Sequence, residues 1–125
     1  MSNPFATFVH PPAPFVLVRI GQTAGPLISG NLLTQLDTGA DRTVIPGELL
    51  HQIELARSGS TIVVGFAGRD DDAPIYDVRL TVAGFDPVPI EVLARVDEPW
   101  VLLGRDVLNH YRIVLDGPNQ TLEIS

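Results

Sequence analysis

The chain has 125 residues, a formal net charge of −7 at pH 7 and no cysteine. This length suits one domain with a single core, and the lack of cysteine excludes disulfide and thiolate chemistry and fits a cytoplasmic location. Nucleic acid is not an expected partner, because phosphate binding needs clustered basic side chains and the chain has only 8 Lys and Arg residues. No apolar run approaches the ~20 residues of a membrane-spanning helix, and no signal-peptide pattern is present, so we expect no membrane partner.

Residues 1–14 are rich in proline and small residues, so we expect an extended N-terminal arm before one folded domain at 15–125. Within that domain, short apolar or β-branched runs alternate with turn residues, which is typical of strands. The expected strands are 15–20, 32–36, 43–45, 61–64, 75–82, 88–93, 101–103, 113–115 and 121–124. One or two helical turns are expected within 48–55, and a short helix at 106–111 with Asp106 as its N-cap. The pattern predicts a closed or strongly twisted all-β domain.

The most informative position is Asp37, which follows the apolar strand 32–36 and precedes a tight turn at Thr38 and Gly39. A carboxylate at the end of a half-buried strand is costly unless something satisfies or uses it. Two neighbouring carboxylates share one proton, so that one accepts a proton from water while the other polarises a scissile carbonyl. The alternative is an ordinary surface turn, since Asp and Gly favour turns in any case.

A second motif, Trp-Val-Leu-Leu-Gly-Arg-Asp, lies at 100–106. Together with Leu-Asp-Thr-Gly-Ala at 36–40, it resembles the retropepsin-like aspartic proteases, whose Asp-Thr-Gly-Ala motif precedes a hydrophobic pair followed by Gly-Arg-Asp or Gly-Arg-Asn. The resemblance implies an all-β fold, a retropepsin-like closed or twisted β-barrel half with one short C-terminal helix. It also implies an endopeptidase that acts on peptide or protein substrates without a cofactor.

The same resemblance implies a homodimer, because the chain contains one Asp-Thr-Gly and a second aspartate must come from another copy across a twofold axis. Asp37, Thr38 and Gly39 would form the catalytic turn, in which Thr38 hydrogen-bonds across the axis and Gly39 brings an amide close to the carboxylate. Ala40 would leave room for the substrate backbone, and Asp41 would contact that backbone.

Arg105 and Asp106 are expected to support the site structurally. Arg105 follows an apolar run, so we expect a buried guanidinium that pairs with Asp41 or Asp106.

The segment 61–82 lies where the family has a β-hairpin flap that covers the substrate and excludes water, although an ordinary surface hairpin is the alternative. Its expected connection, 65–72, departs from glycine-rich retroviral tips because it ends in Arg-Asp-Asp-Asp. Trp100 could equally be a core residue. Besides Ala40 and Asp41, the residues expected to line the substrate cleft are Val64, Gly65, Phe66, Ala67, Gly68, Trp100 and Leu102.

Two other functions stay open at this point. One is a catalytically silent retropepsin-fold module for dimerisation or peptide binding, which the acidic connection favours. The other is a monomeric all-β domain that binds a ligand. A metal site is not expected, because the 3 histidines show no metal-ligand spacing.

Overall fold

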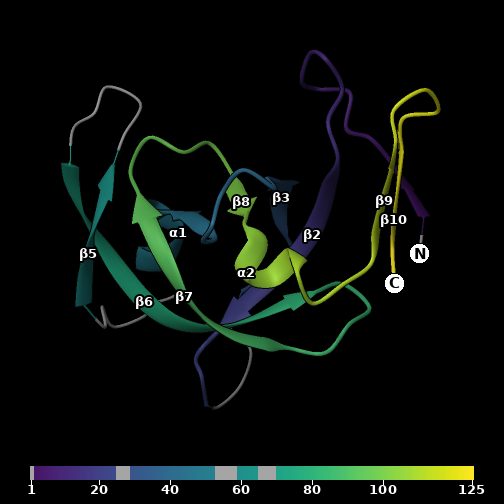
Figure 1. The fold of residues 1–125 in the computed structure, drawn as a ribbon. Coiled ribbons are helices and arrows are strands. Elements are labelled where there is room, and N and C mark those ends of the chain that lie inside the picture. Colours follow the sequence, from purple (N-terminus) through teal and green to yellow (C-terminus); the bar gives the residue numbers. More distant parts are fainter. Residues whose placement is uncertain (1, 25–28, 53–58, 65–69) are drawn as a thin grey trace.

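A computed structural model of the chain describes residues 2–24, 29–52, 59–64 and 70–125, with side chains left undescribed at 60–64 and 70–72 (Figure 1). The strands are β1 (Ser2–Pro4), β2 (Phe15–Gly21), β3 (Leu32–Leu36), β4 (Val44–Pro46), β5 (Gly59–Val64), β6 (Asp70–Val82), β7 (Val88–Arg95), β8 (Val101–Leu103), β9 (Ile113–Asp116) and β10 (Thr121–Ile124). The helices are α1 (Gly47–Gln52) and α2 (Arg105–Leu108). Neither of these described helices is long and apolar enough to cross a membrane.

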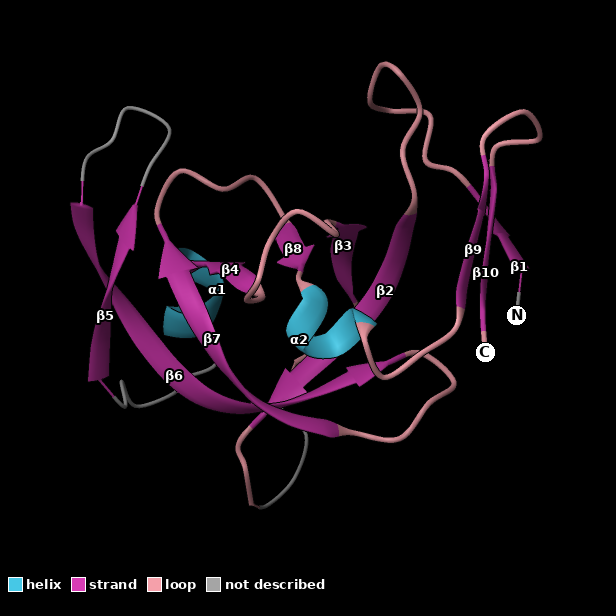
Figure 2. Cartoon of the chain, viewed as in Figure 1, coloured by secondary structure: helices cyan, strands magenta, loops and turns pink. Residues whose placement is uncertain are grey.

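Six of the described strands close into a barrel, in the order β2-β3-β8-β4-β7-β6 and back to β2. The ring closes because β2 changes partner along its length: residues 15–18 pair with β3, and residues 18–21 pair with β6. β5 extends the sheet beyond β6. The resulting β5–β6 hairpin stands on the side of the barrel away from the two chain ends (Figure 2).

The core follows from the two-residue period of the strands. In β2, Val16, Val18 and Ile20 are buried, whereas Leu17 and Arg19 between them are exposed. Val78, Leu80 and Val82 of β6 are fully buried in the same cluster. Removing these apolar surfaces from water is the main stabilising term for the barrel, and the alternating pattern confirms the strands predicted at 15–20 and 75–82.

The two sequence motifs meet through a parallel pairing. β3 runs parallel to β8, and Leu36 lies opposite Leu103 in the register. Because parallel strands end at the same edge of a sheet, the residues that follow them, Asp37 and Gly104, leave the barrel side by side. β4 joins this region by pairing antiparallel with β8 and parallel with β7.

Both chain ends contribute to a separate small sheet with the order β1-β10-β9. β9 and β10 form a C-terminal hairpin that places Ile113 opposite Ile124 and Asp116 opposite Thr121. β1 pairs antiparallel with the other edge of β10. The residues predicted as an extended arm therefore begin with a strand that is hydrogen-bonded to the C-terminal hairpin of the same chain.

Two local predictions were wrong. The acidic run 70–72 belongs to β6 rather than to a connection, because Val64 already lies opposite Asp70; the shortened connection, 65–69, lies outside the described residues. The N-cap of α2 is Gly104, which makes no side-chain capping bond, because the helix begins at Arg105. Asp106 is therefore inside the first turn, and its carboxylate bonds elsewhere.

Candidate active site

Asp37 is held at the end of β3 by three hydrogen bonds. Its amide donates to the carbonyl of Leu103 at 3.0 Å, which continues the parallel pairing. Its carbonyl accepts from the amide of Ala40 at 3.2 Å, and its Oδ1 accepts from the amide of Gly39 at 3.0 Å. The strand thus fixes the backbone, the turn fixes the side chain, and the carboxylate remains only half-buried.

Gly39 allows this close approach of amide and carboxylate. A Cβ at position 39 would lie 3.2 Å from Oδ1 of Asp37, closer than an ordinary van der Waals contact. Thr38, Gly39 and Asp41 are exposed and Ala40 is half-buried, so on a single chain the turn faces solvent. These positions agree with a turn that is open to another molecule.

Arg105 does not make the ion pair predicted for it. Its Nη1 donates to the carbonyl of Thr38 at 2.7 Å, its amide donates to the carbonyl of Ala40 at 2.9 Å, and the residue is exposed. Neither Asp41 nor Asp106 forms a salt bridge with it. The prediction of a buried guanidinium was wrong. α2 begins at the surface, so the guanidinium of Arg105 stays exposed to water while its Nη1 donates to a backbone carbonyl.

Asp106 instead binds Thr43 beneath the turn. Its Oδ1 accepts from the Thr43 hydroxyl at 2.7 Å, and its Oδ2 accepts from the Thr43 amide at 3.0 Å. The same hydroxyl accepts from the amide of Gly104 at 3.1 Å, and Thr43 is fully buried. This network joins the two motifs and satisfies their buried polar groups. Thr43 was not among the predicted site residues; the signal available in the sequence was a threonine at the start of the β-branched run 43–45.

Gly104 has a packing reason to be glycine. A Cβ there would lie 2.5 Å from the carbonyl carbon of Arg42 and 2.9 Å from the amide nitrogen of Thr43. Both are backbone atoms that cannot rotate away. The second motif therefore crosses the segment after the Asp37 turn at a distance that excludes any side chain.

Trp100, which directly precedes β8, is part of an aromatic cluster with Phe8 and Phe15. Its ring lies 5.6 Å from that of Phe8 and 5.1 Å from that of Phe15, measured between centroids, with edge-to-face angles of 77° and 73°. Its Nε1 donates to Oε1 of Gln35 at 2.9 Å, and Gln35 lies two residues before Asp37 in the sequence. Trp100 is half-buried and Phe8 is 56% exposed, so the cluster is part of the surface. Phe8 and Phe15 were not predicted from the sequence as partners of Trp100.

Leu102 is the middle residue of β8. It pairs in register with Gln35 and with Val44, and it packs against a small cluster of Val44, Ala73 and Leu93. Among the other predicted cleft residues, Val64 is described by its backbone alone, as the last residue of β5. Gly65, Phe66, Ala67 and Gly68 lie outside the described residues.

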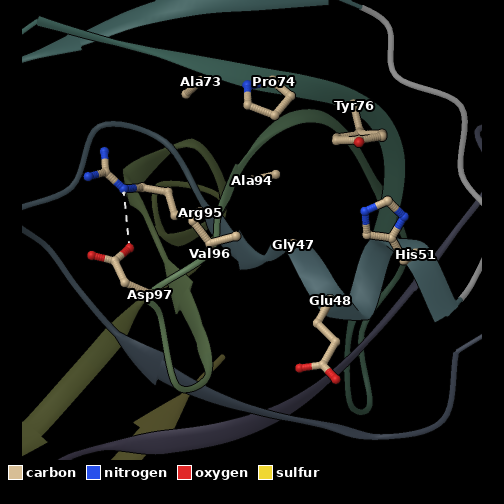
Figure 3. Close-up of a pocket in the computed structure, with 10 residues that line it drawn as sticks. All are labelled: Gly47, Glu48, His51, Ala73, Pro74, Tyr76, Ala94, Arg95, Val96 and Asp97. Carbon is tan, nitrogen blue, oxygen red and sulfur yellow. Dashed lines mark ion pairs between the residues drawn. The ribbon is translucent and has the colours of Figure 1, made fainter.

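A cavity of about 680 Å³ lies away from this turn (Figure 3). α1 supplies Glu48 and His51 to its wall, β6 supplies Tyr76, and the end of β7 supplies Arg95, which pairs with Asp97 at 4.0 Å. None of its lining residues comes from 37–41 or 104–106. Within the described ranges, no three His, Cys, Asp or Glu side chains are grouped so that they could hold a metal ion.

Comparisons with known proteins bear on the fold of this chain. No protein-family model and no curated protein matches the sequence. Solved structures do match: a retropepsin-like aspartic protease from Rickettsia conorii has a TM-score of 0.69 and 13% identity, covering 99% of this chain and 89% of its own. EIAV protease complexed with the inhibitor HBY-793 has a TM-score of 0.61 and 23% identity, covering 84% and 93%. Simian foamy virus (mac) protease has a TM-score of 0.56 and 21% identity, covering 77% and 92%.

This chain has a retropepsin-like fold. The predicted all-β class, the closed barrel and the short helix near the C-terminus are confirmed. In this retropepsin-like barrel, hydrogen bonds bring the turn that begins at Asp37 together with Leu103 and Arg105. Leu102 lies within β8, and Trp100 directly precedes that strand. The identities of 13–23% relate these proteins by fold.

Proposed function

We propose that the protein is a homodimeric aspartic endopeptidase, in which the Asp37 carboxylates of two copies activate a water molecule between them. The observation that carries the proposal is the Asp37 turn itself, anchored to Leu103 at the end of β3 within a retropepsin-like barrel. Oδ1 accepts the amide of Gly39, and Oδ2 accepts no hydrogen bond from the described part of the chain. That oxygen is available for water or for the second carboxylate.

The proposed mechanism divides the work between the two copies. The ionised Asp37 accepts a proton from the attacking water, and the protonated Asp37 donates to the scissile carbonyl oxygen. The Asp37 that took the proton from water then gives it to the departing amine nitrogen, while the other Asp37 takes a proton from a hydroxyl of the tetrahedral intermediate. The C–N bond breaks, and the pair again holds one proton. The exposed hydroxyl of Thr38 would hydrogen-bond across the axis and hold the two turns together. Arg105 would act indirectly, by fixing the Thr38 carbonyl.

The proposed substrate is an extended peptide with large apolar side chains near the scissile bond. Ala40 and Asp41 would contact its backbone, and the cluster around Leu102 would receive an apolar side chain. Trp100 would form a second wall. Residues 64–68 would cover the peptide from the β5–β6 hairpin.

Digestion of a peptide library from about pH 3 to about pH 7 tests this proposal. We expect cleavage by the wild-type protein, inhibition by a statine-type compound, and no cleavage by Asp37→Asn, whose amide oxygen can still accept from Gly39. Cleavage that survives in Asp37→Asn would refute the assignment. Peptide binding without cleavage in the wild type would instead support the silent module, and a monomer at high concentration would support the ligand-binding domain.

A further inference from the structure

The C-terminal hairpin has an open edge at β9. Among the described strands, β9 pairs only with β10, whose other edge is occupied by β1. Arg112 and Ser125 exchange both backbone hydrogen bonds, at 2.9 Å and 3.0 Å. Because such pairs alternate along antiparallel strands, Val114 also bonds toward β10, whereas the N–H and C=O groups of Ile113 and Leu115 point away from it.

The side chains along this edge are unusually apolar for an open strand. Leu115 is opposite the buried Leu122 and lies on the face that packs on the barrel, yet it is 48% exposed. Val114 is on the other face and is 37% exposed. Open edges in monomeric proteins are normally protected by charge, proline or a covering element. The edge of β9 carries apolar side chains on both faces and unpaired backbone groups between them.

We propose that β9 pairs antiparallel with β9 of a second copy, about a twofold axis at Val114. In this register Val114 lies opposite itself, and Ile113 forms hydrogen-bonded pairs with Leu115 of the other copy in both directions. The half-exposed Leu115 is then covered by Ile113 of the second chain. The two small sheets become one continuous sheet with the order β1-β10-β9-β9-β10-β1.

Charge complementarity selects this register and a second copy as the partner. With the axis at Val114, Arg112 lies opposite Asp116 of the other copy, and the symmetric pair repeats the contact. All three residues share one face by the two-residue period, and Arg112 is exposed. Moving the axis to Leu115 would place Asp116 opposite Val114 and leave both charges unpaired. An edge that complements itself in this way suits its own copy.

This interface deepens the proposed function, and only its biological purpose rests on that proposal. The interface would hold together two chains whose Asp37 turns must meet. β1 pairs with β10 of the same chain, so among the strands of this small sheet the interface uses the edge of β9.

Amide hydrogen exchange in the wild-type protein tests the pairing without a mutation. We expect the amides of Ile113 and Leu115 to exchange fast at concentrations where sedimentation shows monomers, and at least about tenfold slower where it shows dimers. The amide of Val114 is the internal control, because it bonds to β10 in both states. Unchanged exchange at Ile113 and Leu115 across the monomer–dimer transition would overturn the proposal.

A charge swap tests the register. Arg112→Asp and Asp116→Arg should each weaken dimerisation by roughly tenfold, because each places like charges opposite one another twice. The double variant should restore dimerisation to within roughly threefold of the wild type, because it recreates both pairs. If the double variant instead dimerises more weakly than either single variant, the proposed register is wrong.

Disulfide trapping separates this inference from the proposed function. The chain has no cysteine, so each single-cysteine variant reports on one position. We expect Val114→Cys to form a covalent dimer on oxidation, because a non-hydrogen-bonded pair places its Cα atoms ~4.5 Å apart, whereas Leu33→Cys, similarly exposed on β3, should not. Thr38→Cys reports on the approach of the two Asp37 turns. Trapping at 114 alone would refute the proposed active site but support this interface, and trapping at 38 alone would do the reverse.

Discussion

Leu36 and Leu103 lie opposite each other on the parallel strands β3 and β8, and this pairing places Asp37 beside Gly104. Two motifs that are far apart in the sequence thereby become one hydrogen-bonded unit. The first motif supplies the carboxylate and its turn. The second supplies the strand that fixes the turn and the helix whose residues bond to it. Stability of this unit and activity of the site should therefore depend on the same contacts.

Thr43→Val should destabilise the protein although the side chain keeps its shape. The substitution removes the hydroxyl that serves both Asp106 and Gly104, and it leaves buried polar groups unpaired. We expect a loss of about 1–3 kcal/mol in the free energy of unfolding, measured by chemical denaturation. The control is Thr34→Val, which is equally buried but whose hydroxyl, within the described residues, bonds to the nearby Leu32 carbonyl alone. Equal losses in both variants would argue against a special role for the Thr43 network.

Gly104→Ala should strongly destabilise the protein. The new Cβ would lie 2.5 Å from the carbonyl carbon of Arg42, so the backbone of one motif must move away from the other. We expect a loss of about 3 kcal/mol in stability. Gly30→Ala, where a Cβ meets nothing within 4 Å, is the matched control and should change stability little. A thermally stable Gly104→Ala protein would show that the two segments are less tightly coupled.

Phe8→Ala should shift the emission of Trp100, the only tryptophan, toward longer wavelength. The Phe8 ring covers one side of Trp100 at a centroid distance of 5.6 Å, so its removal exposes the indole to water. Phe85→Ala is the control, because Phe85 packs on Tyr111 at 4.9 Å instead. Identical emission spectra for Phe8→Ala and Phe85→Ala would contradict the aromatic cluster.

Asn119→Ala should lower stability only where Asp116 is ionised. Hydrogen bonds from the Asn119 side chain and amide lower the pKa of Asp116 below its ordinary value of 3.8. A carboxylate whose pKa is lower in the folded state than in the unfolded state stabilises the fold at pH values above its unfolded-state pKa. This stabilisation is lost as the pH falls through its folded-state pKa. Denaturation at about pH 6 should therefore separate the variant from the wild type, whereas at about pH 2 the difference should shrink. A constant difference at both pH values would point to another cause.

Local patterns in the sequence were enough to predict β2 and most of the later strands, the turn at Asp37 and the fold class, but not β1 or the first residues of β6. The alternation at 15–20 records which side chains enter the barrel, and the resemblance of 36–40 and 100–106 to one family placed both motifs in one site. The partners of individual side chains could not be predicted in this way. Whether Arg105 pairs with a carboxylate or a carbonyl depends on where α2 begins relative to the Asp37 turn, and that is set by tertiary packing. Thr43 and Phe8 act through contacts distant in sequence, to which no local pattern points.

The central claim, that each site uses one Asp37 from each of two chains, is tested most directly by mixing wild-type and Asp37→Asn protein in varying proportions under conditions that allow subunit exchange. If both carboxylates are required, only wild-type pairs cleave peptide, and the activity per total protein falls as the square of the wild-type fraction. A linear fall would show that each chain carries its own complete site, and would contradict the shared Asp37 site.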